Sequence, residues 1–166
     1  MSESIIIPEN LDKNSRYECL IPQLKSLVEG ESDIIANLAN LAAGLKYGMN
    51  FFWVGFYLVK NEELVLGPFQ GPVACTRIKK GKDVCGKAWE SAKAIIVEDV
   101  EKFPKHISCN ALSKSEIVLP VFDSEGNVAM VLDVDSQKTA DFDEIDKAFL
   151  EEVLNFIHVT KLDLHY

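Results

Sequence analysis

The sequence predicts an α/β (α+β) domain in which helices cover a central, mostly antiparallel sheet. Three observations lead to this fold class. Amphipathic helices are expected near both ends of the chain, short strands rich in β-branched and aromatic residues lie between them, and neighbouring strands are joined by hairpin turns. The sequence lacks the strand, Gly-rich turn and helix of a dinucleotide-binding unit, which argues against a doubly wound parallel sheet.

The helices are expected from apolar residues at helical spacing and from capping residues. The first is predicted over residues 15–28, where Pro22 indicates a kink or a later start. The second is predicted over residues 32–45, and Gly44 can help to end it. The last begins near Asp141 and closes the chain as an amphipathic helix.

The strands are expected from alternating apolar residues between turn signals. Turns follow at Asn61-Glu62 and over residues 123–127, so two hairpins are predicted. The longest irregular stretch is expected over residues 68–82, and its basic part is interpreted as a solvated loop. The five predicted strands cover residues 50–59, 63–66, 94–98, 116–122 and 128–135.

Length and composition favour one ordinary globular domain. The chain has 166 residues, 48% hydrophobic and 26% charged, which is enough apolar material for one core without disulfides or metals. We therefore expect a single domain over residues 1–166 with its core at about 17–157. The formal net charge of −9 argues against binding to nucleic acid or to an anionic membrane.

The expected location is the cytoplasm. No apolar stretch approaches the roughly 20 residues that span a bilayer, and the first residues lack the basic region of a signal peptide. Thiols are normally reduced in that compartment. The four cysteines are therefore expected to be catalytic, redox-active or buried rather than a disulfide framework, and they are Cys19, Cys75, Cys85 and Cys109.

Side-chain alternation divides the first strand into two faces. Trp53, Gly55 and Tyr57 share one face, where the glycine leaves room between two rings. This face is suited to be the wall of a small-ligand site, although a helix packed on it would give the same pattern. The other face is expected to belong to the core and carries Phe52, Val54, Phe56 and Leu58.

Carboxylates gather near strand ends later in the chain. Asp133 and Asp135 share a face, and Glu116 lies at the start of a strongly apolar strand. Such groups resist burial unless a cation or a shared proton compensates their charge. They indicate a metal, an ammonium group or acid–base chemistry, and the alternative is a strand end exposed to solvent.

The cysteines show no metal-binding spacing. No Cys-x-x-Cys pair occurs and the histidines fall in no zinc pattern, so a structural metal site is not expected. Cys109 follows Lys105 and His106, whose charges favour a thiolate and hence a nucleophile. Taken alone, each cysteine is better interpreted as a buried, inert thiol.

Together these segments resemble the free methionine-R-sulfoxide reductases, a family built on the GAF domain. The resemblance covers about residues 17–156 and keeps six motifs and three cysteines in the family's order. It implies a six-stranded, mostly antiparallel sheet with helices packed on it, and a closed pocket for one free amino acid. The motifs are Trp53–Tyr57, Gly67–Cys75, Val84–Gly86, Phe103–Cys109, Ser115–Pro120 and Val131–Ser136.

The resemblance also implies the roles of the site residues. Cys109 matches the nucleophile, Cys75 the principal resolving cysteine and Cys85 a secondary, recycling cysteine. Trp53 and Tyr57 match residues around the substrate's methyl and sulfoxide groups. The residues that match the acidic cluster for the sulfoxide and the ammonium group are Glu116, Asp133 and Asp135.

The implied activity is reduction of free L-methionine-(R)-sulfoxide to L-methionine through a sulfenic acid and a disulfide, with thioredoxin as the reductant, no bound cofactor and no metal. A role against oxidative stress follows. A homodimer is consistent with a GAF domain but stays open. Two alternatives also stay open: a non-catalytic GAF module that senses a small ligand, and a thiol-based redox sensor.

Two departures from the family pattern stand close to these cysteines. Asn110 follows the nucleophile position where the family usually has Asp, which leaves one fewer negative charge there. Asp83 stands where a glycine is common. Neither removes a catalytic group.

Overall fold

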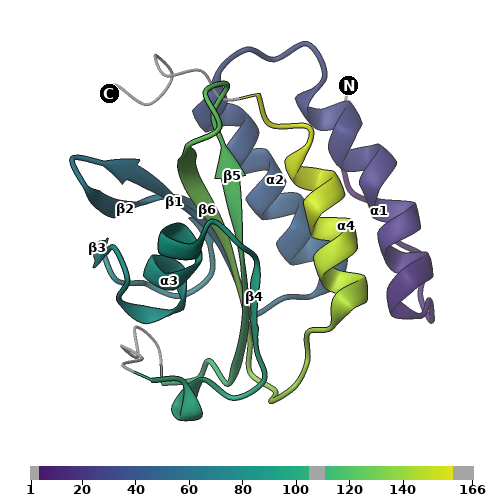
Figure 1. Cartoon of the computed structure of the whole chain (residues 1–166). Coiled ribbons are helices and arrows are strands. Elements are labelled where there is room, and N and C mark those ends of the chain that lie inside the picture. The colour runs from purple at the N-terminus through teal and green to yellow at the C-terminus, as the bar shows by residue number, and fades with distance from the viewer. Residues whose placement is uncertain (1–3, 105–110, 159–166) are drawn as a thin grey trace.

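The computed structural model describes residues 4–104 and 111–158. Within these residues a six-stranded sheet separates two unequal helical layers (Figure 1). Its elements are α1 (Lys13–Val28), α2 (Ile34–Met49), β1 (Trp53–Lys60), β2 (Glu63–Gln70), β3 (Arg77–Lys79), α3 (Asp83–Ser91), β4 (Ile95–Val97), a 3₁₀ turn (Val100–Lys102), β5 (Ser115–Phe122), β6 (Val128–Ser136) and α4 (Glu144–Leu154).

The sheet has the order β3-β2-β1-β6-β5-β4, and every neighbouring pair is antiparallel. This confirms the predicted fold class. The hairpin between β5 and β6 is also confirmed, because the Asp123 carboxylate accepts the N–H groups of Glu125 and Asn127 in the predicted turn. No described helix is both long and apolar enough to cross a membrane.

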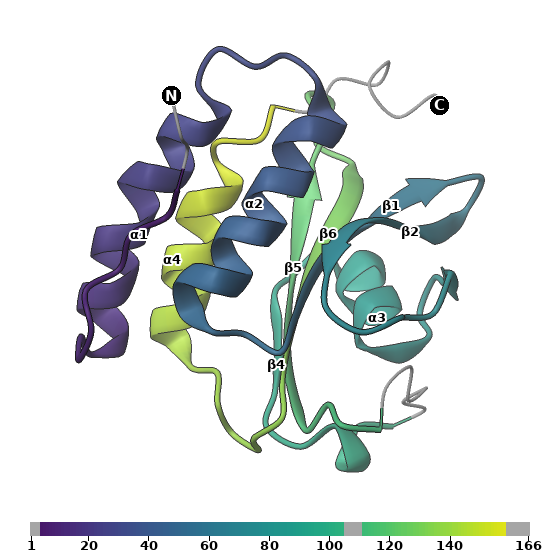
Figure 2. The same cartoon turned by 180° about the vertical axis from the view of Figure 1, so that it is seen from behind.

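Helices α1, α2 and α4 cover one face of the sheet and form the larger core with it (Figure 2). Val54, Phe56 and Leu58 point into this core, as the alternation of β1 predicts. Phe52 does not: β1 begins at Trp53, and Phe52 packs against the opposite face.

The helix boundaries differ from the predictions where a capping residue was not recognised. Helix α1 begins at Lys13, two residues early, because the Asp12 carboxylate caps it, and Pro22 lies inside it. Helix α2 continues past Gly44 to Met49 and ends at Asn50 in the left-handed conformation. Gly44 is instead a packing position, since a Cβ there would lie 2.3 Å from Leu24.

The irregular stretch predicted over residues 68–82 is partly wrong. Strand β2 continues to Gln70, with Pro68 in a bulge where the register against β1 shifts, and a bulge tolerates the missing N–H of proline. Strand β3 falls in the basic segment that was interpreted as a loop.

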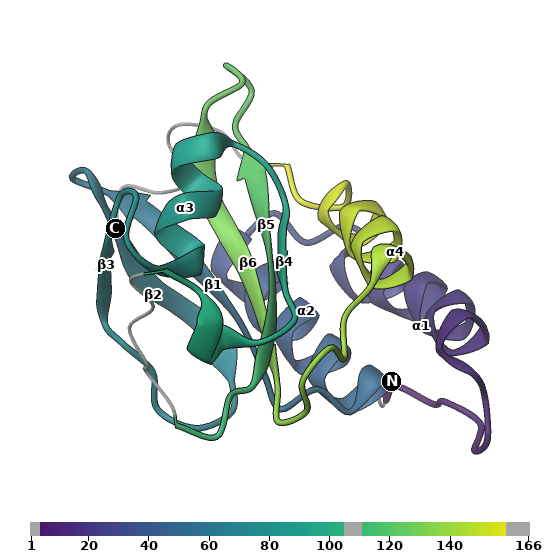
Figure 3. The same cartoon turned by 60° about the horizontal axis from the view of Figure 1, so that its bottom comes forward.

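Helix α3 was not predicted either. It packs on the second face of the sheet, opposite the other three helices (Figure 3).

Candidate functional site

The second face of the sheet brings the predicted aromatic and acidic residues together. In the register of β1 against β6, Trp53 lies opposite Asp135 and Gly55 opposite Asp133. Glu116 of β5 lies opposite Asp135 on the other side of β6. Alternation along the three strands therefore points their side chains to one side. Helix α3 packs on this face, as the alternative interpretation of the alternation predicted, and the ligand-wall interpretation stays a prediction.

Helix α3 carries Cys85 onto this face. The helix approaches β3 closely at Gly86, where a Cβ would lie 2.4 Å from the carbonyl oxygen of Lys79. The Gly86 carbonyl also accepts the N–H of Gly81 at 2.9 Å. Gly86 is thus required by a backbone contact, and that contact fixes the cysteine one residue before it.

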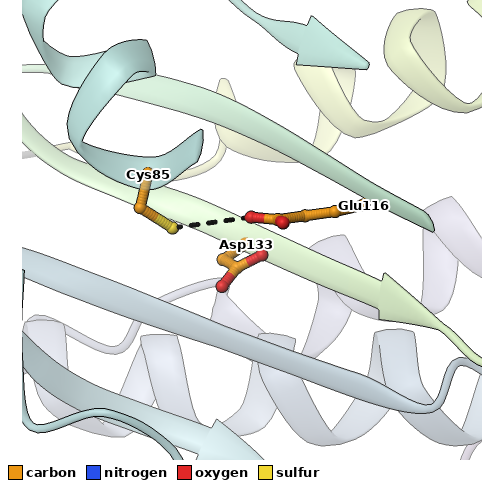
Figure 4. Close-up of side chains that lie close together, drawn as sticks. All are labelled: Cys85, Glu116 and Asp133. Atoms are coloured by element: carbon orange, nitrogen blue, oxygen red, sulfur yellow. Dashed lines mark hydrogen bonds between the residues drawn. The ribbon is translucent and has the colours of Figure 1, made fainter. Parts of the chain in front are cut away.

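Cys85, Glu116 and Asp133 meet between α3, β5 and β6 (Figure 4). The Cys85 thiol donates to Oε1 of Glu116 at 3.9 Å, and one ligand atom from each residue lies within 4.8 Å of the others. Their exposed fractions are 1%, 4% and 7%. Among the described residues, Oδ1 of Asp133 has no hydrogen-bond partner. This set is acidic, buried and able to accept a cation.

Burial and like charge hold protons on this cluster. Burial, followed by the charges of Asp133 and Asp135, raises the pKa of Glu116 well above its ordinary value. The pKa of Asp133 is raised by burial and by Asp135. Burial and the charge of Asp133 raise the pKa of the Cys85 thiol. Burial and neighbouring charge thus favour the protonated, neutral forms of the two carboxyls and of the thiol.

Asp135 is the more accessible member of the acidic set. It is half-buried at the end of β6, and its Oδ1 accepts a short hydrogen bond from the hydroxyl of buried Ser113. Ser113 was not predicted as a site residue. Its position shortly before β5 was the only signal, and a serine in a loop is too common to single out.

An aromatic wall closes the side of the site formed by β1 and β2. The Trp53 ring lies over Gly55, where a Cβ would come within 2.2 Å of Cη2. It also stacks on Tyr57 and on Phe69, with ring centroids 6.1 and 5.4 Å apart. Phe69 was missed because β2 was expected to end at Leu66. The space over Gly55, which was predicted to lie between two rings, is occupied by the Trp53 ring itself.

The same aromatic residues hold the loop that carries Cys75. Trp53 Nε1 donates to the Pro72 carbonyl oxygen at 2.9 Å, and the Tyr57 hydroxyl donates to the Cys75 carbonyl oxygen at 3.0 Å. Burial raises the pKa of this hydroxyl, so it remains a donor. A cysteine from a loop is thereby tied to the edge of the acidic face.

Sequence and fold comparisons agree on one family. The GAF domain family matches residues 29–159. The free methionine-R-sulfoxide reductase of Saccharomyces cerevisiae is 38% identical over 90% of this chain and 87% of its own length. This chain belongs to the GAF-domain family of free methionine-R-sulfoxide reductases. A Dictyostelium discoideum protein described as GAF domain-containing protein A is 57% identical, over 95% of this chain and 99% of its own length.

A solved structure of this family has the same fold. The free methionine-R-sulfoxide reductase of Neisseria meningitidis, determined in complex with its substrate, superposes with a TM-score of 0.89. It is 48% identical, and the match covers 93% of each chain.

The predicted cysteines of this family member are in different states. Cys75 is half-buried and disulfide-bonded, whereas Cys85 and Cys19 are free thiols. Cys19 lies on α1 and accepts a hydrogen bond from Gln23, away from the acidic face. Cys109, predicted to be the nucleophile, lies outside the described residues together with its neighbours Lys105, His106 and Asn110.

The backbone conformation at Asp83 explains why a glycine is common at this position in the family. It is buried at the first position of α3 with φ +56°, in the left-handed region that favours glycine. A glycine is thus the unstrained residue at this position. The aspartate instead adds a negative charge that contributes to the raised pKa of Cys85, Glu116 and Asp133.

Proposed function

We propose that this protein reduces free L-methionine-(R)-sulfoxide to L-methionine. The observation that carries the proposal is the buried pair of carboxyls with raised pKa, Glu116 and Asp133, on the same face of the sheet as Trp53. A sulfoxide needs a proton donor for its oxygen and an apolar contact for its methyl group, and this face offers both. The relatives named free methionine-R-sulfoxide reductases support the same substrate.

In the proposed reaction the Cys109 thiol attacks the sulfoxide sulfur as a thiolate. The sulfoxide oxygen takes up protons with the help of Glu116 and Asp133, and it ends on the cysteine sulfur. The products are methionine and a Cys109 sulfenic acid, so the cysteine is oxidised by two electrons and the substrate is reduced by two. Asp135, which is more accessible, pairs with the substrate's ammonium group.

Cys75 is the proposed principal resolving cysteine. Its thiol condenses with the sulfenic acid to give a disulfide and one molecule of water. Its loop is anchored by Tyr57 at the acidic face, and it is the cysteine found in a disulfide while Cys85 and Cys19 are free. We therefore propose the pair Cys75–Cys109, with Cys85 in a secondary, recycling role.

Thioredoxin is the proposed reductant. A dithiol of this type reduces the disulfide by thiol–disulfide exchange and returns both cysteines to thiols. The proposed setting is the cytoplasm, where the enzyme would recover free methionine during oxidative stress.

The decisive experiment supplies racemic free methionine sulfoxide, thioredoxin, thioredoxin reductase and NADPH to the full chain. We expect NADPH to be consumed and the R epimer alone to disappear. Chromatography of the remaining sulfoxide separates the two epimers and measures the loss of each. Cys109→Ser should abolish turnover, whereas Cys19→Ser should leave it unchanged. Sustained turnover in Cys109→Ser would remove that residue as the nucleophile.

The same assay separates the alternatives. If neither epimer is consumed with thioredoxin or with dithiothreitol, the proposal is wrong and a GAF ligand sensor becomes the better hypothesis. A redox sensor would form its disulfide with peroxide but show no acceleration by methionine sulfoxide. Turnover with dithiothreitol but not with thioredoxin would support the proposed reaction and show that the physiological reductant is another dithiol.

A further inference from the structure

Cys85, Glu116 and Asp133 also form a set of ligands for a metal ion. We propose that Zn²⁺ binds to these three side chains and competes with the free amino acid for the site. The competition rests on the proposed function, whereas the metal site itself does not. Zinc would thus act as a reversible inhibitor and not as a cofactor.

The geometry needs only a small adjustment to bind the ion. The three ligand atoms come from three separate elements, α3, β5 and β6, and lie within 4.8 Å of one another. Zn–S and Zn–O bonds of about 2.3 and 2.0–2.2 Å place tetrahedral ligands roughly 3.3–3.7 Å apart. A contraction of about 1 Å therefore completes three positions and leaves the fourth for water or another ligand.

The unpaired oxygen of Asp133 points to a missing ligand. This carboxyl is only 7% exposed, and its Oδ1 has no hydrogen-bond partner among the described residues. Figure 4 shows the Asp133 carboxyl close to the Cys85 sulfur and the Glu116 carboxyl. Buried polar atoms are normally paired, so an unpaired oxygen in such a cluster is expected to meet a ligand.

The donor types favour zinc over harder ions. Mg²⁺ and Ca²⁺ require six or more oxygen ligands, while this cluster offers one sulfur and two carboxylates. Zn²⁺ accepts thiolate and carboxylate ligands in four-coordinate sites. The carboxyls of Asp83 and Asp135 add negative charge around it, which also favours a dication.

Competition follows because one cluster serves two ligands. Glu116 and Asp133 are the proposed partners of the sulfoxide, and both would be held by the ion. The ion also neutralises the charge that attracts the ammonium group. Zinc and free methionine should therefore exclude each other.

The test uses the full chain in its disulfide form, where Cys85 and Cys19 are the free thiols among the described residues. Cd²⁺ is the spectroscopic probe, because a cadmium–thiolate bond gives an ultraviolet charge-transfer band. We expect one equivalent to bind and Zn²⁺ to displace it. Cys85→Ala should lose the band, and calorimetry with Zn²⁺ should show affinity at least about tenfold lower in Glu116→Gln and Asp133→Asn.

The matched controls are Cys19→Ser, which removes the other free thiol, and Glu90→Gln, which removes an exposed carboxyl of α3. Both should bind Zn²⁺ like the parent chain, and added free methionine should weaken binding in proportion to its concentration. No binding by the parent chain, a band that persists in Cys85→Ala, or unchanged affinity in both carboxyl variants would overturn the proposal.

Methionine sulfoxide turnover is measured separately, in the presence of a chelator that removes Zn²⁺. This measurement tests the proposed reductase activity independently of the zinc site. Normal turnover without metal binding would remove the zinc site alone. Binding without turnover would remove the reductase and keep the zinc site. If methionine leaves the Zn²⁺ affinity unchanged in an active enzyme, the proposed competition is wrong.

Discussion

The two faces of the sheet each bury an aspartate, and the two carboxyls are treated in opposite ways. Asp146 of α4 is 1% exposed, and both of its oxygens are paired. Tyr17 donates to Oδ1 at 2.8 Å, while Lys13 and the N–H of Asp143 donate to Oδ2 at 2.5 and 2.9 Å. Asp133 of β6 is 7% exposed and keeps one oxygen without a partner among the described residues.

The difference indicates that the Asp146 carboxylate has a structural role, whereas the Asp133 carboxyl remains available to bind a ligand. Asp146 ties α1 to α4, and its capping box with Asp143 starts α4. Its negative charge is compensated by a lysine. Asp133 faces other acidic groups, so the fold is penalised whenever its carboxyl ionises. Burying a carboxyl without a compensating partner costs free energy. Such a cost is expected at a site where a bound ligand supplies the missing contact.

The largest effect expected from this comparison is on activity. Asp133→Asn should lower kcat/KM for methionine-R-sulfoxide by about 10²–10⁴, because the amide cannot deliver a proton to the sulfoxide oxygen. Thermal unfolding should show stability equal to or above that of the parent chain, since a buried acid is removed. Glu151→Gln, an exposed carboxyl on α4, is the control. A variant that is as active as the parent would remove Asp133 from the reaction.

Asp146→Asn should show the reverse pattern. The substitution removes the buried negative charge and one of the two oxygens that accept from Tyr17, Lys13 and the N–H of Asp143, so unfolding in urea should report a loss of about 2–4 kcal/mol. Turnover per folded molecule should remain that of the parent at low temperature. Tyr17→Phe should cost less, about 1 kcal/mol, because it removes one hydrogen bond. If Asp146→Asn is as stable as the parent chain, the contrast between the faces fails.

The pH dependence of stability sharpens the same contrast. Groups with a raised pKa in the folded state, here Glu116 and Asp133, favour the folded state while protonated, and this contribution is lost as pH rises through the folded pKa. The stability of Asp133→Asn relative to the parent should therefore grow from pH 5 to pH 8, by about 1.4 kcal/mol for each pH unit in this range over which the folded carboxyl stays protonated. The groups facing Asp133 are Asp83, Cys85, Glu116 and Asp135.

The measurement is urea unfolding at both pH values, with the exposed-site variant Glu151→Gln as the comparison. A difference between Asp133→Asn and the parent that stays constant with pH would show that the Asp133 carboxyl titrates normally.

The grouping of the candidate site residues on one face of the sheet was predictable because it rests on alternation. A period of two placed Trp53, Gly55 and Tyr57 together, and the same rule placed Asp133 beside Asp135. Alternation also separated this face from the core. It gave no information on which strands are neighbours, so the register that brings Glu116 opposite Asp135 required the folded sheet.

The missed elements share a physical reason, which is that tertiary contacts override local signals. Helix α3 is short and contains Gly86, a poor helix former whose role is a backbone contact with Lys79. Pro68 suggested the end of β2, but a bulge accommodates it. The capping residue Asp12 precedes a segment without clear helical spacing, so the start of α1 was placed too late.

The smallest effect concerns Asp83, where backbone strain and charge act together. Its φ of +56° costs an aspartate about 1 kcal/mol that a glycine avoids, so Asp83→Gly should be more stable by about that amount. It also removes one acidic neighbour of Asp133, so the gain should be larger at pH 8 than at pH 5.

Ala92 provides the matched control at the other end of α3. It has φ +52° and is exposed, so Ala92→Gly relieves similar strain without changing any charge. Its gain, measured by urea unfolding, should be the same at both pH values. If both variants gain equally at pH 5 and pH 8, Asp83 acts through its backbone alone. A gain in Asp83→Gly that rises with pH assigns the excess to the acidic face, because strain does not titrate.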